Sequence, residues 1–156
     1  MLRNLIACAV LALTAGCSSL CDRERLPFRG DASSPEHTVA IAQYACKNEC
    51  WSALYDLASA KTKEKYSYIE FRVGFPRLTV PGGQEKVCTL VAATSPDVLV
   101  SHWHWGEKWR LAILTLPTGE GSRDLNVLLV QEKGEDEKLE WHVALQEQVD
   151  KKVAFD

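Results

Sequence analysis

The sequence has no marked excess of charge of either sign. Its 18 basic and 21 acidic residues give a formal net charge of −3, and no long run of one sign occurs. There is therefore no electrostatic reason to expect nucleic acid as a partner. Glycine-rich phosphate loops, a Gly-x-Ser-x-Gly elbow and a His-Glu-x-x-His motif are also absent, which removes several common enzyme classes. We predict no cofactor.

The sequence also lacks an apolar run long enough to cross a bilayer as a permanent helix, which takes roughly 20 residues. Its N-terminal apolar stretch, residues 5–13, follows a single positive charge at Arg3 and ends shortly before Cys17. This arrangement is typical of an export signal. We therefore predict a signal peptide over residues 1–16.

The end of that signal, LTAGCSS at residues 13–19, resembles the lipobox of bacterial lipoproteins. Thr14 stands where that family usually has leucine, and an ordinary secretory cleavage site is the alternative. The resemblance implies cleavage before Cys17 and attachment of diacylglycerol to its sulfur. The mature protein would then be held in the cell envelope by acyl chains. Ser18 resembles the default sorting signal of lipoproteins, which predicts the periplasmic face of the outer membrane.

The segment that follows Cys17 looks like a connection. Residues 17–33 mix charges with Pro27, Gly30 and serines, without hydrophobic periodicity. This composition predicts a lipidated tether. A single folded domain is then expected over residues 34–150, with residues 151–156 as a C-terminal tail.

Export permits disulfides, and four cysteines remain after Cys17: Cys21, Cys46, Cys50 and Cys88. The spacing of four between Cys46 and Cys50 allows a disulfide if a helix ends there, which would leave Cys21 to pair with Cys88. Free buried thiols are the alternative. A zinc site is less favoured because no second closely spaced pair of cysteines or histidines stands at finger-like separation.

Helices are predicted in the first half of the domain. Ser34 as an N-cap and Pro35 at the first helical position predict a helix over residues 35–47. A second helix is expected over residues 50–60, where apolar residues recur at helical spacing. The lysine-rich residues 61–65 are read as a solvated connection, and Ser67 as the cap of a third short helix that turns Tyr68, Phe71 and Phe75 inward.

The second half changes to β-type sequence separated by turn-forming residues. Short connections demand antiparallel pairing. The predicted fold class is therefore α+β, with N-terminal helices packed on a curved antiparallel meander sheet. The expected strands are residues 87–93, 98–105, 109–116, 125–132 and 139–146.

The run SPEHTVAIAQYACKNECWSALYDLASAKTKEKYSYIEF, which begins at Ser34, resembles the opening of nuclear transport factor 2-like domains. Asn48-Glu49 stands where that family often has Gly-Asp, and Leu57-Ala58-Ser59 where it has Leu-Leu-Ser. The resemblance implies a cone whose sheet and helices enclose a pocket over residues 34–150. It also implies frequent dimerisation through the outer face of the sheet.

The stretch HWHWGEKW at residues 102–109 is the most distinctive in the chain. Gly106-Glu107 suits a two-residue type II′ hairpin, which would place His102 opposite Leu111 and His104 opposite Trp109. Alternation then puts both histidines on the helix-covered face with Trp109, Leu111 and Ile113. The opposite face would pair Trp103 with Arg110 and Trp105 with Lys108, as a surface for a partner or a second copy.

The predicted ligand pocket consists of His102, His104, Trp109 and Tyr55, although core packing is the simplest role for Tyr55. The two histidines supply half of a usual zinc set, and His142 or Cys88 would have to complete it, so no metal is predicted. His102 and His104 are the candidate general bases if the protein is an enzyme.

Two main functions follow. The first is a non-catalytic module that binds a small apolar or amphipathic ligand in the cone, or an envelope protein or a second copy through the sheet face. The alternative is an isomerase- or dehydratase-type enzyme that uses His102 or His104, although no set of family catalytic positions matches this sequence residue by residue. A purely structural role would be favoured if the cone is filled by its own side chains.

Overall fold

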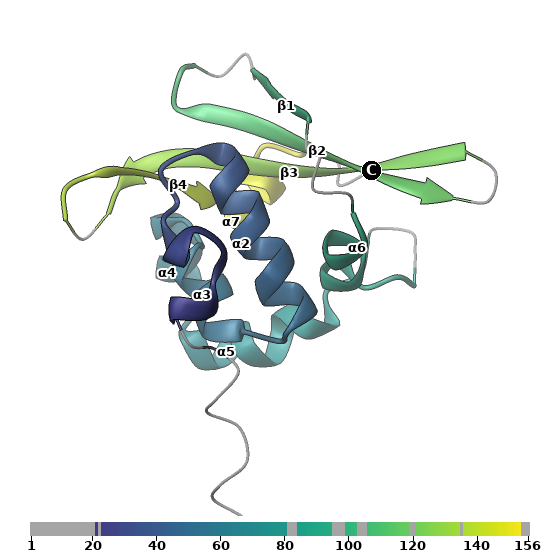
Figure 1. Cartoon of the computed structure of the whole chain (residues 1–156), viewed down its shortest axis with the longest axis horizontal. Coiled ribbons are helices and arrows are strands. Elements are labelled where there is room, and N and C mark those ends of the chain that lie inside the picture. The colour runs from purple at the N-terminus through teal and green to yellow at the C-terminus, as the bar shows by residue number, and fades with distance from the viewer. Residues whose placement is uncertain are drawn as a thin grey trace, which may run out of the picture.

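The computed structural model describes residues 21, 23–80, 84–94, 99–102, 106–118, 121–134 and 136–153. The predicted signal peptide, Cys17, Trp103, His104, Trp105 and the last three residues lie outside this part of the chain. Helices cover one face of a four-stranded antiparallel sheet with strand order β1-β2-β3-β4 (Figure 1). The predicted α+β class is thereby confirmed.

The sheet is built from β1 (Leu99–His102), β2 (Trp109–Thr118), β3 (Gly121–Lys133) and β4 (Leu139–Val143). The helices are α2 (Pro35–Lys47), α3 (Trp51–Asp56), α4 (Ala60–Lys65), α5 (Tyr68–Gly74), α6 (Val87–Ala93) and α7 (Leu145–Asp150). Three short 3-10 helices are η1 (Arg23–Arg25), η2 (Pro27–Gly30) and η3 (Phe75–Arg77). Within the described residues no helix is both long and apolar enough to span a membrane.

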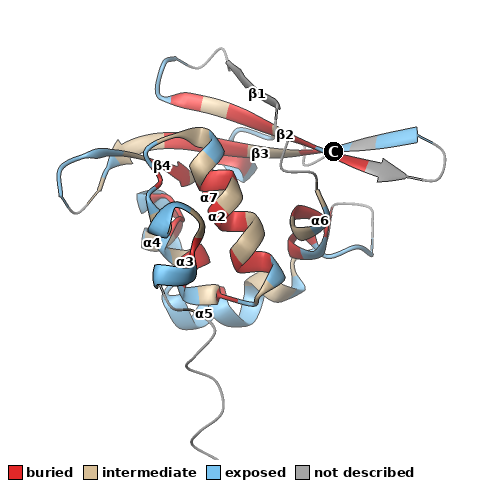
Figure 2. Cartoon of the chain, viewed as in Figure 1, coloured by how far each residue is buried: buried red, intermediate tan, exposed pale blue. Residues whose placement is uncertain are grey.

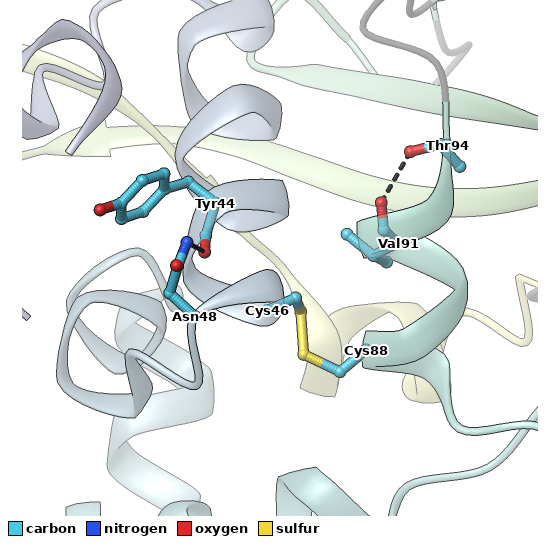
Figure 3. Close-up of a disulfide and its surroundings, with 6 residues drawn as sticks. All are labelled: Tyr44, Cys46, Asn48, Cys88, Val91 and Thr94. Atoms are coloured by element: carbon cyan, nitrogen blue, oxygen red, sulfur yellow. Dashed lines mark hydrogen bonds between the residues drawn. A yellow bond between two sulfur atoms is a disulfide. The ribbon is translucent and has the colours of Figure 1, made fainter. Parts of the chain in front are cut away.

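Local capping determines the bounds of α2, which match the prediction. The Ser34 hydroxyl accepts a hydrogen bond from the His37 backbone N–H at 3.2 Å, and Pro35 occupies the first helical position. At the other end the Asn48 side-chain amide donates to the Tyr44 carbonyl at 2.8 Å (Figure 3). Glu49 then takes a positive φ of 55° as the chain leaves the helix.

The second predicted helix is broken in the structure, because residues 57–59 run along the outer edge of β4. The Val143 N–H donates to the Leu57 carbonyl at 2.7 Å, and the Ser59 N–H donates to the Val143 carbonyl at 3.0 Å. Ser59 then caps a new helix, α4, by accepting from the Thr62 N–H. The prediction of a solvated connection at residues 61–65 is therefore wrong.

Residues 87–93 were predicted as a strand and form helix α6. Their buried positions, Val87, Cys88, Leu90 and Val91, follow the spacing of a helix face. The helix packs beside the last turns of α2, to which the Cys46–Cys88 disulfide joins it (Figure 3). Gln43 of α2 also donates a hydrogen bond to the Thr94 hydroxyl at the end of α6.

The last predicted strand is also shorter than expected, because β4 ends at Val143 and α7 begins at Leu145. Beyond the end of β4, the side chain of Gln148 takes the place of a strand partner for β3. Its Oε1 accepts from the Leu128 N–H at 3.0 Å, and its Nε2 donates to the Asn126 carbonyl at 2.9 Å. Gln148 is fully buried, so these bonds satisfy polar groups that would otherwise be lost from water.

The N-terminal part of the described chain is not an extended tether. Cys21 forms a disulfide with Cys50, and Leu26 and Ala32 are buried in the main core. The Ala32 carbonyl accepts from the Trp141 N–H at 2.8 Å, which adds this segment to the edge of β4. The tether prediction is wrong for residues 23–33, because Leu26 and Ala32 are buried although the segment has no helical or strand period.

The two disulfides join Cys21 to Cys50 and Cys46 to Cys88, with Cα–Cα distances of 5.1 and 5.2 Å. The predicted pairing of Cys46 with Cys50 is therefore wrong. At the exit of α2, Cys46 lies against α6, whereas Cys50 has turned toward the N-terminal segment. Although Cys46 and Cys50 are only four residues apart, their side chains point to different sides where the chain leaves the helix.

The sheet buries residues on both faces (Figure 2). One face meets the helices through Ala112, Leu114 and Leu116 of β2, with Leu125 and Leu129 of β3. The other face carries a smaller cluster of Trp109, Leu111, Leu128 and Val130, against which Ala144 and Val153 pack.

The predicted hairpin register is wrong by one residue, because His102 pairs with Arg110 and not with Leu111. The predicted helix-covered face is also wrong: Trp109 and Leu111 lie on the opposite face from Ala112 and Leu114. A turn bond runs from the Trp109 N–H to the Gly106 carbonyl at 3.1 Å, so Glu107 and Lys108, and not Gly106 and Glu107, are the central residues of the described turn.

Candidate functional site

Two of the four residues predicted to form one ligand pocket, Tyr55 and Trp109, lie in different parts of the molecule. Tyr55, on α3, packs against Tyr68 and Phe71 with ring centroids at 5.5 and 5.3 Å. Its hydroxyl donates to the Tyr66 carbonyl at 3.0 Å, so it holds the helices together on the covered side of the sheet.

Trp109 is buried on the other face of the sheet. The ammonium groups of Lys151 and Lys108 lie over its ring, at 4.9 and 5.6 Å from the centroid. Arg110, predicted beside Trp103, lies over the Trp141 ring at 5.2 Å. Trp109 and Tyr55 therefore do not share a pocket. The side chain of His102 and all of His104 lie outside the described residues, and the enzyme alternative rests on them.

The space between helices and sheet, where a cone-shaped domain would hold its ligand, is nearly filled. The remaining cavity is about 40 Å³, and its walls are apolar side chains such as Val39, Leu54, Phe71 and Leu114. Small-molecule sites typically occupy about 300–1,000 Å³. The interior therefore has no room for a ligand of more than a few atoms.

A larger apolar groove opens on the surface between α5 and α7. Its volume is about 290 Å³. Its apolar walls are Phe71, Phe75, Leu78 and Leu145, with Tyr66 and Val149 at 39% and 59% exposure. Gly74 contributes to the hollow, because a Cβ at this position would meet no atom within 4 Å.

The polar side chains along this groove are already occupied by the protein. The Glu70 carboxylate accepts from the backbone N–H and the hydroxyl of Ser67, both at 2.8 Å, and these bonds lower the pKa of Glu70. The Gln146 amide donates to Asp150 at 2.7 Å. What the groove offers to a ligand is thus mainly apolar contact.

A buried polar network fixes α7 beside α4 and so forms the floor of the groove. The Ser59 hydroxyl donates to the Glu147 carboxylate at 2.8 Å and lies 2.9 Å from the Thr62 hydroxyl oxygen. Thr62 in turn accepts from the Gln146 N–H at 3.1 Å. At the surface, Lys61 contacts Asp150 at 2.5 Å, which raises the pKa of the lysine and lowers that of the aspartate.

A second, polar recess lies beside His142 on β4. Its volume is about 410 Å³, and its ionisable lining comprises Asp56, Lys63, Glu132, Lys133, Asp136, Glu140 and His142. His142 is only 8% exposed, and neither ring nitrogen has a hydrogen-bond partner among the described residues. Its Nε2 is 3.9 Å from a Glu140 carboxylate oxygen, beyond hydrogen-bond reach.

Burial is the main cause of a lowered pKa for His142, and the charge of Lys63 adds to it, whereas Glu132, Glu140 and a backbone interaction with Leu57 act in the opposite direction. The imidazole is therefore neutral at pH 7. A buried polar group without a partner costs about 1–3 kcal/mol. Such a group is therefore a marker for a site that something else completes.

From the sequence, His142 was considered only as a possible third zinc ligand beside His102 and His104, with Cys88 as the other candidate. Cys88 is held in a disulfide. His102 lies on β1 and His142 on β4, so two strands separate them, and that distance is roughly 14 Å at the usual strand spacing. No group of three or more histidine, cysteine, aspartate or glutamate side chains in the described ranges could hold a metal ion.

No protein-family model matches this sequence, and neither the curated proteins nor the solved structures contain a significant match.

Proposed function

We propose that the chain is an exported, lipid-anchored protein of the bacterial cell envelope. We further propose that its domain is a non-catalytic module, which binds a small apolar or amphipathic ligand in the groove between α5 and α7. The groove is the observation that carries the binding proposal: it is concave, mainly apolar and close to the lower size limit of small-molecule sites.

Two features support export. The lipobox-like segment ends at Cys17, and the four cysteines that follow it form two disulfides. Disulfides persist in oxidising compartments such as the periplasm and are rare in the cytosol. The lipid anchor and the periplasmic face of the outer membrane remain proposals from residues 13–19.

The relation to nuclear transport factor 2-like domains is also a proposal. The order of N-terminal helices followed by a meander sheet supports it. A cone nearly filled by its own side chains favours a structural role for the interior, so the proposed ligand would lie outside it, in the groove. The outer sheet face is less suited to a partner, because Ala144 and Val153 already pack on Trp109 and Leu111.

Filling the groove tests the binding proposal. Gly74→Leu places an apolar side chain in open space at the end of α5, where the backbone has an ordinary helical conformation. The neutral apolar dye N-phenyl-1-naphthylamine should bind the wild-type protein saturably with increased fluorescence. The variant should bind it at least tenfold more weakly, since the side chain occupies the space of the dye.

Val73→Leu is the matched control. Val73 is an exposed neighbour on the same helix and is not part of the groove. This variant should keep wild-type affinity, and both variants should keep the circular dichroism spectrum of the wild type. Equal affinity of Gly74→Leu and wild type, or no saturable dye binding at all, would refute the groove as the binding site.

A further inference from the structure

We propose that the recess at His142 is a second binding site, distinct from the apolar groove, for a small organic cation that carries N–H donors, such as a primary amine or a guanidinium group. The site is made by β4, the end of α3, the start of α4 and the turn that joins β3 to β4.

His142 is buried because both neighbours of its strand position are covered by other segments. The Trp141 N–H donates to the Ala32 carbonyl, and the Val143 N–H donates to the Leu57 carbonyl. Two hollows meet at the imidazole, one of about 120 Å³ and the larger recess of about 410 Å³. Asp56 and Glu140 line both hollows together with His142. His142 thus lies at the border of both hollows, with its two ring nitrogens buried.

The larger recess carries four carboxylates, from Asp56, Glu132, Asp136 and Glu140, and two ammonium groups, from Lys63 and Lys133, which is a net charge of −2 when His142 is neutral. Two groups of the lining already have backbone partners: the Lys63 Nζ donates to the Asp56 carbonyl, and a Glu132 carboxylate oxygen accepts from the Ala60 N–H, both at 2.8 Å. An anion would therefore meet net repulsion in the recess, whereas a cation would be attracted.

The hydrogen-bonding chemistry points the same way. Ionised carboxylates only accept hydrogen bonds, and a neutral imidazole offers one acceptor nitrogen. A ligand with several N–H donors and a positive charge can satisfy that nitrogen and a carboxylate together. A metal ion is disfavoured, since the described residues place no three suitable side chains around one point.

Position 134 restricts the Glu140 carboxylate. A Cβ built on Gly134 would lie 2.6 Å from the carboxylate carbon of Glu140, so a side chain here would displace this group. Gly134→Ala therefore moves the carboxylate without removing its charge. Glu140→Gln removes the charge and nearly keeps the shape.

The test uses the full chain with isotope-labelled histidine, so that NMR follows each imidazole. Agmatine, which has one amine and one guanidinium group, should shift the His142 signals saturably and leave those of His37 unchanged. Glu140→Gln and Gly134→Ala should each weaken this binding at least tenfold. The control is Glu137→Gln, an exposed carboxylate on the same turn that is not part of the recess, and it should bind as the wild type does.

Affinity should also fall several-fold between pH 7.5 and pH 5, because a protonated His142 adds positive charge among Lys63, Asp56, Glu132, Asp136 and Glu140. The proposal is refuted by any of three results: no saturable shift with agmatine, as expected if only water fills the recess; equal loss of affinity in Glu140→Gln and Glu137→Gln; or tighter binding of propionate than of agmatine.

Discussion

At the scale of single residues, the burial of His142 depends on segments far away in the sequence, so the residues around it do not predict it. The sequence of β4, LEWHV, indicates a strand, but Trp141 and His142 are consecutive and both buried. Alternation predicts that one of two successive residues is exposed. His142 is covered because residues 57–59, which lie 83 to 85 positions earlier in the chain, run along the edge of β4.

The burial of His142 predicts a pH dependence of stability. Its pKa is lower in the folded than in the unfolded protein, where it is about 6.5, so the unfolded chain binds more protons. The stability due to the neutral ring is fully present above pH 6.5 and is lost as pH falls below that value toward the folded pKa. The loss is about 1.4 kcal/mol for each unit between the two pKa values.

Urea unfolding at pH 7.5, 6.5 and 5.5 measures this effect. The free energy of unfolding should decrease more steeply with acidification in the wild type than in His142→Phe, which cannot be protonated. His37→Gln serves as the control and should keep the wild-type slope. Identical slopes for wild type and His142→Phe would show that burial of this ring does not govern the acid side of the stability profile.

At the scale of elements, local signals were sufficient for prediction and non-local ones were not. The bounds of α2 and the cap of α5 at Ser67 follow from hydrogen bonds within four residues, and both are confirmed. The break between α3 and α4 depends on pairing with β4, and the helical state of residues 87–93 on packing against α2. Their apolar spacing fits either state, because Val87 and Val91 have β propensity while 87, 90 and 91 share a helix face.

The candidate sites divide in the same way. Tyr55 was predicted to line the ligand pocket, with core packing as its simpler role, and in the structure it is partly buried against the core. The groove could not be predicted, because it needs α7, whose first two residues, Leu145 and Gln146, were predicted to end the last strand. His102 and His104 were predicted as site residues because they lie in a histidine- and tryptophan-rich stretch. The histidine that the structure shows to be buried without a hydrogen-bond partner on its ring nitrogens is His142.

Two serine caps provide a comparison between a buried and an exposed helix start. Ser59→Ala removes the cap of α4 and also the donor to the buried Glu147 carboxylate, and it should cost about 2–4 kcal/mol. Ser67→Ala removes an exposed capping box on α5 and should cost about 1 kcal/mol. Chemical denaturation of both variants measures the difference. Equal costs would contradict the stabilising role given to the α4–α7 network.

The Cys46–Cys88 disulfide joins α2 to α6 across 42 positions. By the chain-entropy relation, a loop of this length stabilises the folded state by about 4 kcal/mol. The double variant Cys46→Ser/Cys88→Ser should therefore have a much lower denaturation midpoint. Treatment of the wild type with a reductant should lower the midpoint in the same direction, and an unchanged midpoint in both experiments would contradict the pairing.

At the scale of the whole molecule, apolar residues on both faces of the sheet are covered by other parts of the chain. The helices cover one face of the sheet, and the chain after β4 returns to cover part of the other (Figure 1). The sites that remain open lie at the margins of this arrangement: the apolar groove where α7 meets α5, and the polar recess where β4 meets α3. The two proposed ligands would thus bind between neighbouring elements at the surface and not in the interior.

The N-terminal disulfide adds a consequence for the proposed anchor. Only three residues separate Cys17 from Cys21, and Cys21 is bonded to Cys50 at the start of α3. The four residue steps from Cys17 to Cys21 span at most roughly 14 Å even when fully extended. Acyl chains on Cys17 would therefore hold the domain close to the membrane surface.

Substitution of the proposed lipid attachment site tests this at the level of the intact protein. Cys17→Ser should abolish acylation and move the protein from the detergent phase to the aqueous phase, because the acyl chains that would hold it in the detergent phase are lost. Cys21→Ser/Cys50→Ser keeps Cys17, so it should stay in the detergent phase while it frees residues 23–33 to proteolysis. If Cys17→Ser partitions with detergent as the wild type does, the lipid anchor is refuted, and with it the close approach of the domain to the membrane.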